Sequence, residues 1–160
     1  MPHSFSLGTV QVQLPPLERF GQFLQTRGKR LTQQRRTIVE QVFSHHDHFD
    51  VEELLDHLRE MIARRQVSRP TVYRTLAELV EASLLRQMTI GSRSVYEHDY
   101  GYPRHDHLYC QSCNQLIEFH SRDLERIRDA VARENDFEVT GHRMFIMGTC
   151  AACRRASRKQ

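Results

Sequence analysis

Four cysteines occur in this chain, and all of them lie in Cys-x-x-Cys pairs: Cys110 with Cys113, and Cys150 with Cys153. Two thiolates separated by two residues can bind one tetrahedral ion, and a second pair from a distant segment completes a four-cysteine site. Redox-active thiols are the alternative chemistry for such pairs. Four thiolates leave no position for a substrate water, so we predict a structural Zn²⁺ site.

A second group of donors adjoins the first cysteine pair, in the run His105-Asp106-His107-Leu108-Tyr109-Cys110. Alternate residues of an extended segment share a face, so His105 and His107 can point the same way while Asp106 points to the other face. A single histidine is more often a surface or capping residue than a ligand. The His-Asp-His run beside a metal-type cysteine pair nevertheless predicts a second site of nitrogen and oxygen donors.

Polar, basic and aromatic residues also cluster in the first turns of one predicted helix. They are Ser68, Arg69, Thr71, Tyr73 and Arg74. Helix-turn-helix proteins contact base edges with such turns, although a half-buried core tyrosine is the alternative for Tyr73. Residues 27–36 and 64–74 are basic and contain no acid, so they can form a phosphate-binding face although the net charge is only +3. Solvated helix ends are the alternative for these two stretches.

Hydrophobic periodicity predicts the elements that position these residues. A first helix begins near Leu17 and stops near Gly28, and Thr32, Asp50 and Ser68 cap three more. The third helix is expected to be continuous from residue 51 to residue 62. Alternation over 84–90 and 94–97, on either side of residues 91–93, predicts a hairpin. Helices followed by a hairpin describe a winged helix.

The second half of the chain predicts a small α/β unit. We expect strands at 107–110 and 115–119, a helix capped by Ser121 with Leu124, Ile127 and Val131 on one side, and a final strand over 137–147. Such a small unit needs a second copy to bury its apolar surface. The predicted class is α+β. Its parts are an arm (1–16), a winged helix (17–98), a hinge (99–104), a dimerisation and metal-binding domain (105–153) and a solvated basic tail (154–160).

Composition narrows the class of protein. Residues 1–16 contain no lysine, no arginine and no apolar run, so we expect neither a signal peptide nor a membrane anchor. Cysteines at metal spacing without a secretory signal predict a reducing, cytoplasmic location. We see no nucleophile–base pair and no phosphate loop, so we do not expect an enzyme, and a metallohydrolase is the alternative from another class.

Several motifs together carry a family resemblance over about 17–153. They are Thr71-Val-Tyr-Arg-Thr-Leu76, Gly91-Ser-Arg-Ser-Val-Tyr-Glu97, His105-Asp-His-Leu-Tyr-Cys-Gln-Ser-Cys113, Ile117-Glu-Phe119 and Cys150-Ala-Ala-Cys153. In this order they resemble the ferric uptake regulator (Fur) family of metal-dependent bacterial repressors. The resemblance implies an N-terminal winged helix, a hinge and a C-terminal α/β dimerisation domain. It also implies a homodimer on a palindromic, A·T-rich operator in double-stranded DNA, with tetramers left open.

The resemblance further implies a regulatory metal site and its ligands. These correspond to His48, Glu97, His105, His107 and Glu118. All are nitrogen or oxygen donors, which suit Fe²⁺, Mn²⁺, Co²⁺ or Zn²⁺. Zinc sensors of the family tend to use a cysteine here and peroxide sensors tend to use aspartates, so the two glutamates favour an Fe²⁺ sensor that controls iron homeostasis. An Fe²⁺- or Mn²⁺-dependent peroxide sensor is the alternative within the family.

A third site and several DNA contacts follow from the same resemblance. The third site corresponds to Asp106, Glu125 and His142, but Arg104 replaces the fourth ligand, a histidine. Because a guanidinium does not bind cations, we predict a weak or missing site, in which either water completes three ligands or Arg104 pairs with Glu125. For DNA, Tyr73 is expected at bases, Arg74 at phosphate or guanine, Arg35 at phosphate, and Lys29 or Arg30 in a minor groove. His45 and His46 have no assigned role.

Overall fold

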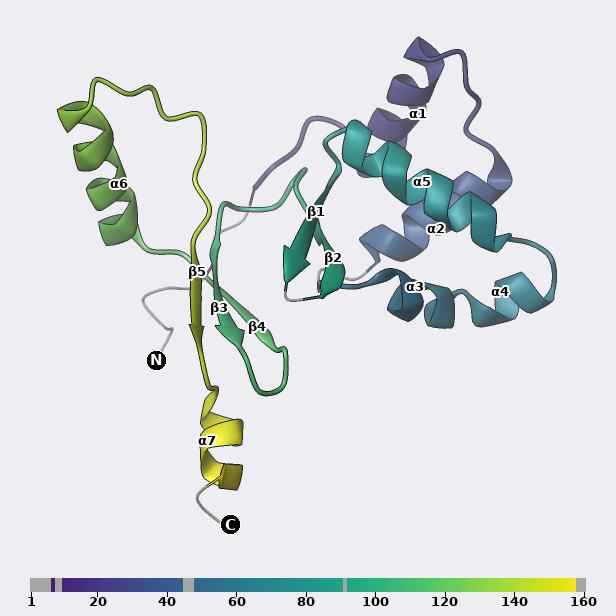
Figure 1. Ribbon diagram of the computed structural model, residues 1–160. Coiled ribbons are helices and arrows are strands. Elements are labelled where there is room, and N and C mark those ends of the chain that lie inside the picture. The colour runs from purple at the N-terminus through teal and green to yellow at the C-terminus, as the bar shows by residue number, and fades with distance from the viewer. Residues whose placement is uncertain (1–6, 8–9, 45–47, 91, 158–160) are drawn as a thin grey trace. The chain divides into compact units, whose positions relative to one another are not determined.

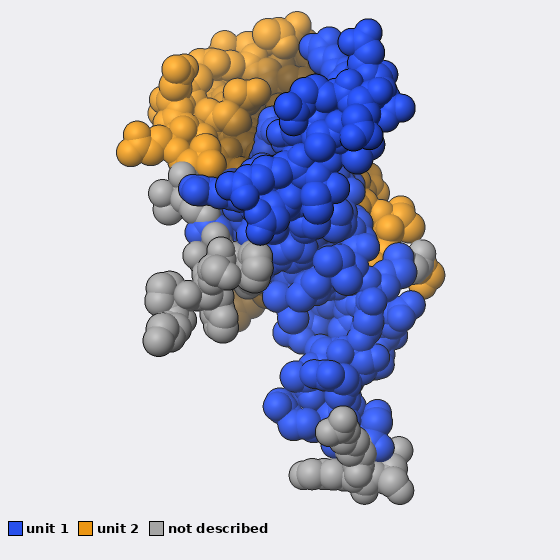
Figure 2. All heavy atoms as spheres, turned by 90° about the vertical axis from the view of Figure 1, so that its left-hand side faces the viewer, with its two compact units in different colours: residues 1–9, 103–160 blue, residues 10–102 orange. Residues whose placement is uncertain are grey.

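The computed structural model describes residues 7, 10–44, 48–90 and 92–157 of this α+β protein. The chain divides into two compact units, one formed by residues 10–102 and the other by residues 103–160 together with 1–9 (Figure 2). His45, His46 and Gly91 lie outside the described residues, as do most of the first nine residues and the last three. No helix in the described part of the chain is long and apolar enough to cross a membrane.

The unit of residues 10–102 contains five helices followed by a two-stranded hairpin in its described part (Figure 1). The elements are α1 (Pro16–Thr26), α2 (Gln33–Phe43), α3 (Val51–His57), α4 (Arg59–Ala63), α5 (Arg69–Glu81), β1 (Leu85–Ile90) and β2 (Arg93–His98). This arrangement is the predicted winged helix. Its core is formed by side chains that are at most 1% exposed, among them Phe20, Leu24, Ile38, Leu76 and Leu79.

The predicted helix caps of this unit are confirmed. Thr32 accepts a hydrogen bond from the backbone N–H of Arg35 at 3.4 Å, which caps α2. Ser68 caps α5 in the same way by accepting from the N–H of Thr71 at 3.4 Å. Asp50 caps α3 through a reciprocal capping box with Glu53. Each cap satisfies donors that the first helical turn leaves without partners, and so fixes where the helix begins.

The third helix is not continuous, contrary to the prediction for residues 51–62. It breaks at Leu58, whose φ of −89° and ψ of 3° separate α3 from α4. Leu58 is completely buried at this break. No glycine or proline marks the position, so tertiary packing of the Leu58 side chain, rather than local sequence, accounts for the interruption.

The hairpin of β1 and β2 forms the wing. Its antiparallel register runs from Leu85 opposite His98 to Ile90 opposite Arg93, so Arg93 begins β2 instead of lying in the predicted turn. Phe49, which precedes α3, forms an isolated antiparallel bridge with Tyr96 of β2. The two rings also stack, with centroids 5.6 Å apart. The segment before α3 is therefore attached to the wing through the backbone.

The unit of residues 103–160 is built on a three-stranded sheet. Its elements are β3 (Asp106–Cys110), β4 (Leu116–Phe119), α6 (Arg122–Glu134), β5 (Phe145–Gly148) and α7 (Ala151–Ser157). The central strand β3 pairs antiparallel with β4 and parallel with β5, and α6 lies in the connection between these two edge strands. Ser121 caps α6, as predicted, by accepting from the N–H of Leu124. In Figure 1, α6 and α7 lie beyond opposite ends of the sheet.

The final strand of this unit is shorter than predicted. The strand expected over 137–147 is reduced to β5, because β3 is only five residues long and pairing with it begins at His107 opposite Phe145. The backbone before β5 serves other contacts, since the N–H of Met144 donates to Asp106 at 3.0 Å. Of the basic tail predicted over 154–160, residues 154–157 are the last part of α7, and Arg154 and Arg155 are exposed.

One face of this sheet carries apolar side chains that remain exposed. Leu108 of β3 lies opposite Ile117 of β4 and Ile146 of β5, which places the three side chains in one row across the sheet. They are 38%, 43% and 45% exposed. On α6, Ile127 and Val131 are also exposed. The sheet therefore presents a row of three exposed apolar side chains on one face.

Candidate metal centres and DNA-binding surface

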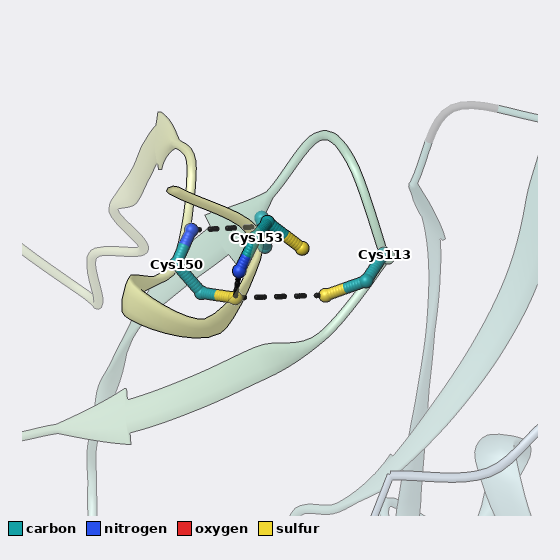
Figure 3. A group of neighbouring side chains, drawn as sticks. Cys113, Cys150 and Cys153 are labelled. Carbon is teal, nitrogen blue, oxygen red and sulfur yellow. Dashed lines mark hydrogen bonds between the residues drawn. The ribbon is translucent and has the colours of Figure 1, made fainter. Parts of the chain in front are cut away.

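The four cysteines come together at one end of the sheet, which confirms the predicted cluster. Figure 3 shows three of them, Cys113, Cys150 and Cys153. Cys110 ends β3, Cys113 lies in the turn after it, Cys150 follows β5 and Cys153 lies in α7. Their four sulfur atoms lie within 4.8 Å of one another. The Sγ atoms of Cys113 and Cys150 are 3.8 Å apart, which is the separation that two ligands of tetrahedral zinc with Zn–S bonds of about 2.3 Å require. The donor set and its spacing therefore fit structural zinc.

The electrostatics of this cluster also favour a bound dication. Backbone N–H groups, first that of Cys150 and then that of Cys113, lower the pKa of Cys110 to about 6. Hydrogen bonding to the sulfurs of Cys150 and Cys113 raises the pKa of Cys153 to about 12. One sulfur is thus held as a thiolate by N–H donors, while the last thiol loses its proton readily only when a cation offsets the neighbouring sulfurs.

Three of the predicted regulatory ligands lie together in the unit of residues 103–160. The Nε2 atom of His105 is 3.6 Å from a carboxylate oxygen of Glu118. His107 lies opposite Glu118 in the β3–β4 register, and its ring centroid is 4.7 Å from that of His105. Alternation along the extended segment brings the two imidazoles to the same face, as predicted.

His105 and His107 are each held in orientation by a neighbour, Pro103 and Phe145 respectively. The Nδ1 atom of His105 lies 2.8 Å from the carbonyl oxygen of Pro103, which can only accept, so Nδ1 carries the proton. In the neutral ring Nε2 then carries the lone pair, which is the arrangement that metal-ligating histidines use. His107 is 1% exposed and stacks on Phe145 with centroids 4.9 Å apart. The pair is held in place before any ion binds.

The other two predicted ligands lie together in the unit of residues 10–102. The Nε2 atom of His48 is 3.4 Å from a carboxylate oxygen of Glu97, and the Glu97 side chain is only 4% exposed. The neighbouring bridge between Phe49 and Tyr96 fixes the segment of His48 against the strand of Glu97. The Nη1 atom of Arg86, in β1, lies 3.5 Å from the other carboxylate oxygen of Glu97. Sequence patterns did not identify Arg86, because its approach depends on the β1–β2 register.

The third predicted site is not assembled as a metal centre. His142 lies 3.2 Å from Asp106, but Glu125 forms its ion pair with His120 at 3.4 Å. Among the described residues, Asp106, Glu125 and His142 do not form a group of donors close enough together to share an ion. Arg104 is exposed. The structure thus brings Asp106 and His142 together and directs Glu125 to His120, a residue that the sequence had not indicated.

The predicted DNA-contacting residues lie on α5 and on the elements before it. Tyr73 is 50% exposed and does not belong to the hydrophobic core, contrary to the alternative interpretation, and Arg69 and Arg74 are exposed as well. Thr71 shares a hydrogen bond of 2.7 Å with Ser68 at the start of α5. A groove of about 640 Å³ runs beside this helix. Its lining residues are Lys29, Thr32, Gln33, Gln34, Arg35, Thr71, Arg74 and Glu78.

The acidic residue in this basic groove was not foreseen. Glu78 is 7% exposed and accepts hydrogen bonds from Lys29 at 2.7 Å and from Arg35 at 2.8 Å. Arg35 also donates to the carbonyl oxygen of Arg30 at 2.7 Å. Two of the predicted DNA-contacting cations are therefore held by one buried carboxylate, while Arg30 is exposed.

A winged helix, a small α/β unit with a four-cysteine zinc cluster, and nitrogen and oxygen donors in both units define a metal-dependent DNA-binding regulator. Comparison with known proteins agrees, since the model of the Ferric uptake regulator family matches residues 26–147. The chain belongs to the ferric uptake regulator family, and it is a metal-dependent transcriptional repressor of that type. Members of the family are DNA-binding, dimeric regulators.

Similar proteins include both iron and peroxide regulators. The ferric uptake regulation protein of Campylobacter jejuni is 33% identical over 137 residues, which cover 86% of this chain and 87% of that protein. The peroxide-responsive repressor PerR of Staphylococcus epidermidis is 29% identical over 131 residues, which cover 82% of this chain and 85% of that protein. The solved ferric uptake regulator Fur of Vibrio cholerae is 28% identical, with a TM-score of 0.66 and coverage of 81% and 98%. The solved Fur structure of Helicobacter pylori, which is described with three functional metal-binding sites, shares the fold with a TM-score of 0.80. It is 23% identical, and the match covers 92% of this chain and 97% of that one.

Proposed function

We propose that this protein is an iron-responsive repressor in which His48, Glu97, His105, His107 and Glu118 share one regulatory Fe²⁺. The observation that carries the proposal is that these donors are already paired within each unit, His48 with Glu97 and His105 with Glu118. Carboxylate oxygens and imidazole nitrogens are ligands that suit a first-row divalent cation. Such a cation also offsets the negative charge of the two carboxylates.

The donor types suit several first-row divalent ions, Fe²⁺ among them. All five are nitrogen or oxygen donors, and the four cysteines form a separate cluster. This set suits Fe²⁺, Mn²⁺, Co²⁺ or Zn²⁺, with intrinsic affinity rising toward Zn²⁺. Cellular availability therefore has to contribute to selection. The two glutamates, together with the Campylobacter jejuni relative named for ferric uptake, support iron as the signal and iron homeostasis genes as the targets.

The proposed switch couples the two units through their shared ligands. When His48 and Glu97 bind the same cation as His105, His107 and Glu118, residues 99–104 can no longer let the units move independently. Each winged helix is then held ready for the operator. Shifting a two-state dimer from about 1:99 to about 99:1 takes roughly 5.5 kcal/mol of differential metal affinity, which two ions per dimer can supply together.

DNA recognition is proposed for the exposed side of α5. Tyr73 and Arg74 are exposed there beside Thr71, in the turns that helix-turn-helix proteins place against base edges. Ser68 and Arg69 flank them at the start of the helix. Arg35 and Lys29 line the adjoining groove and supply phosphate contacts, with Lys29 or Arg30 directed to a minor groove rich in A·T pairs.

We propose that two copies associate through the exposed apolar row of Leu108, Ile117 and Ile146. These residues are 38–45% exposed in a unit whose described buried apolar residues are only Cys110 and Ala132. Covering the row with the same row of a second copy removes apolar surface from water and gives a two-fold dimer. Such a dimer presents two copies of α5 to the half-sites of a palindromic operator.

The test is metal-dependent binding to a DNA duplex selected by the protein from a random-sequence pool in the presence of Fe²⁺. Affinity is measured under anaerobic conditions with Fe²⁺, Mn²⁺ and Zn²⁺ at matched free concentrations and fixed salt. Glu97→Ala and His105→Ala are expected to abolish the metal dependence while the zinc of the four-cysteine cluster is retained. Unchanged metal dependence in both variants would exclude the shared site.

Peroxide sensing is the second candidate, favoured by the likeness to PerR of Staphylococcus epidermidis. In this alternative, oxidation of His48 or His105 by peroxide at the bound metal releases the DNA. Mass spectrometry after brief treatment of the Fe²⁺ form with dilute peroxide separates the two functions. Rapid gain of one oxygen on a ligand histidine, accompanied by loss of DNA binding, supports peroxide sensing, whereas an intact histidine supports iron sensing.

A further inference from the structure

Arg128 of α6 occupies the region that the family resemblance assigns to a third metal. Its Nη1 atom lies 2.8 Å from Nδ1 of His142, and the Nε2 atom of His142 lies 3.2 Å from Oδ2 of Asp106. The other edge of the same guanidinium, through Nε and Nη2, holds Asp129 at 2.8 Å. A chain of contacts thus runs from α6 through His142 to β3.

The donor and acceptor roles of its two neighbours fix which nitrogen of His142 carries the proton. A guanidinium only donates, so Nδ1 of His142 must accept from Arg128. In the neutral ring Nε2 then carries the proton and donates to the carboxylate of Asp106. Both nitrogens of His142 are therefore engaged, and neither offers a lone pair to an ion.

The remaining donors are committed as well. One oxygen of Asp106 accepts from His142, and the other accepts from the backbone N–H of Met144 at 3.0 Å. Glu125 is paired with His120. The Arg128 side chain is a guanidinium, which stays positively charged in proteins. A divalent ion would have to displace these contacts beside a fixed positive charge.

We infer that Arg128 is a permanent substitute for the third metal ion. It links α6 to the segment before β5 and, through His142 and Asp106, to the central strand. The resulting protein uses two metal sites per subunit, the zinc cluster and the regulatory site, and α6 is held without an exchangeable ion. The inference rests on contacts within one unit and does not depend on the proposed regulatory function.

The test counts metal ions in a protein whose regulatory site has been disabled by His105→Ala and Glu118→Gln. After equilibration with excess Co²⁺ and gel filtration, mass spectrometry of the metals is expected to give one equivalent per subunit, held by the cysteines. Adding Arg104→His and Arg128→Gln is expected to create a second equivalent. Arg126→Gln with Arg104→His is the matched control, because Arg126 lies on the same helix with its side chain 78% exposed, and it is expected to add none.

Two results would overturn the inference. One is a second equivalent in the parent protein that Asp106→Asn removes, since the site would then bind metal despite Arg128. The other is no additional equivalent in a folded Arg104→His/Arg128→Gln protein, since Arg128 would then not be what blocks the site. The parent measurement needs no substitution at Arg128, so the first of these results can be obtained even when that substitution impairs folding.

Discussion

Replacing Glu78 by glutamine removes the negative charge that holds two predicted DNA-contacting cations. Glu78 is nearly buried, with Lys29 at 2.7 Å and Arg35 at 2.8 Å from the same oxygen. Glutamine keeps the shape of the side chain but not its charge. The three groups together carry a net charge of +1 in the natural protein and +2 in the variant.

The two consequences of Glu78→Gln have opposite signs. Loss of a fully buried ion-pair partner costs about 3–5 kcal/mol, whereas exposed pairs contribute about 0–1 kcal/mol. The Lys29 and Arg35 side chains are 45% and 18% exposed, so we expect a loss of about 1–2 kcal/mol in the free energy of unfolding. DNA binding should strengthen at low salt, because one additional positive charge per subunit is available to phosphates.

The size of the expected change in the salt dependence of DNA affinity follows from counterion release. One more neutralised phosphate per subunit steepens the plot of log affinity against log salt by about 0.9, or about 1.8 for a dimer. Between 50 and 200 mM salt, the advantage of the variant over the natural protein should therefore shrink by about 12-fold. Fluorescence anisotropy on a fixed duplex at saturating metal, at four salt concentrations, measures this slope.

Glu81→Gln is the matched control. Glu81 lies three residues further along α5 and pairs with Arg27 at 2.6 Å, but its side chain is 49% exposed and Arg27 does not line the groove beside α5. We expect little change in its salt slope. Parallel slopes for Glu78→Gln and the natural protein, or weaker binding at every salt concentration, would show that Glu78 does not hold these cations back from DNA.

Three further predictions concern the fold and the zinc cluster. Leu79→Ala should lower the free energy of unfolding by about 2–5 kcal/mol in urea titrations, because Leu79 is completely buried and alanine leaves a cavity; a loss under about 1 kcal/mol would contradict this packing. Cys153→Ser should remove the tightly bound zinc, measured as metal content after dialysis, and retention of a full equivalent would mean that three thiolates suffice. Burial alone would raise the pKa of Asp50, but hydrogen bonds from Arg93 and Glu53 outweigh it and lower that pKa below its ordinary 3.8. Its ion pair therefore stabilises the fold above about pH 4 and is lost as the pH falls through the lowered value, a slope in acid-unfolding curves that Asp50→Asn should reduce.

Local features of this fold could be predicted from the sequence because their causes lie within a few residues. Thr32, Asp50, Ser68 and Ser121 each accept from an N–H three positions later, and all four cap a helix as expected. The cysteine pairs behave similarly, since each pair can bind one ion from a single turn. Such features need no knowledge of the tertiary structure.

Features that depend on distant partners could not be predicted in this way. The break at Leu58 and the short β5 reflect packing and the length of β3, which no local pattern reports. The contacts of Glu78 with Lys29 and Arg35 join residues 49 and 43 positions apart. Arg128 reaches His142 only because the segment after α6 runs back to β5, so periodicity along α6 could not indicate that contact.

The zinc cluster also has a consequence for synthesis on the ribosome. Cys113 precedes Cys150 by 37 positions, so the first thiol pair emerges well before the second. At about 5–20 residues per second, this delay lasts roughly 2–7 s. During that interval the nascent chain carries two thiols without their final partners, open to oxidants and to competing soft cations such as Cu⁺. In cells exposed to copper or peroxide, newly made molecules of this protein should therefore be damaged in preference to mature ones.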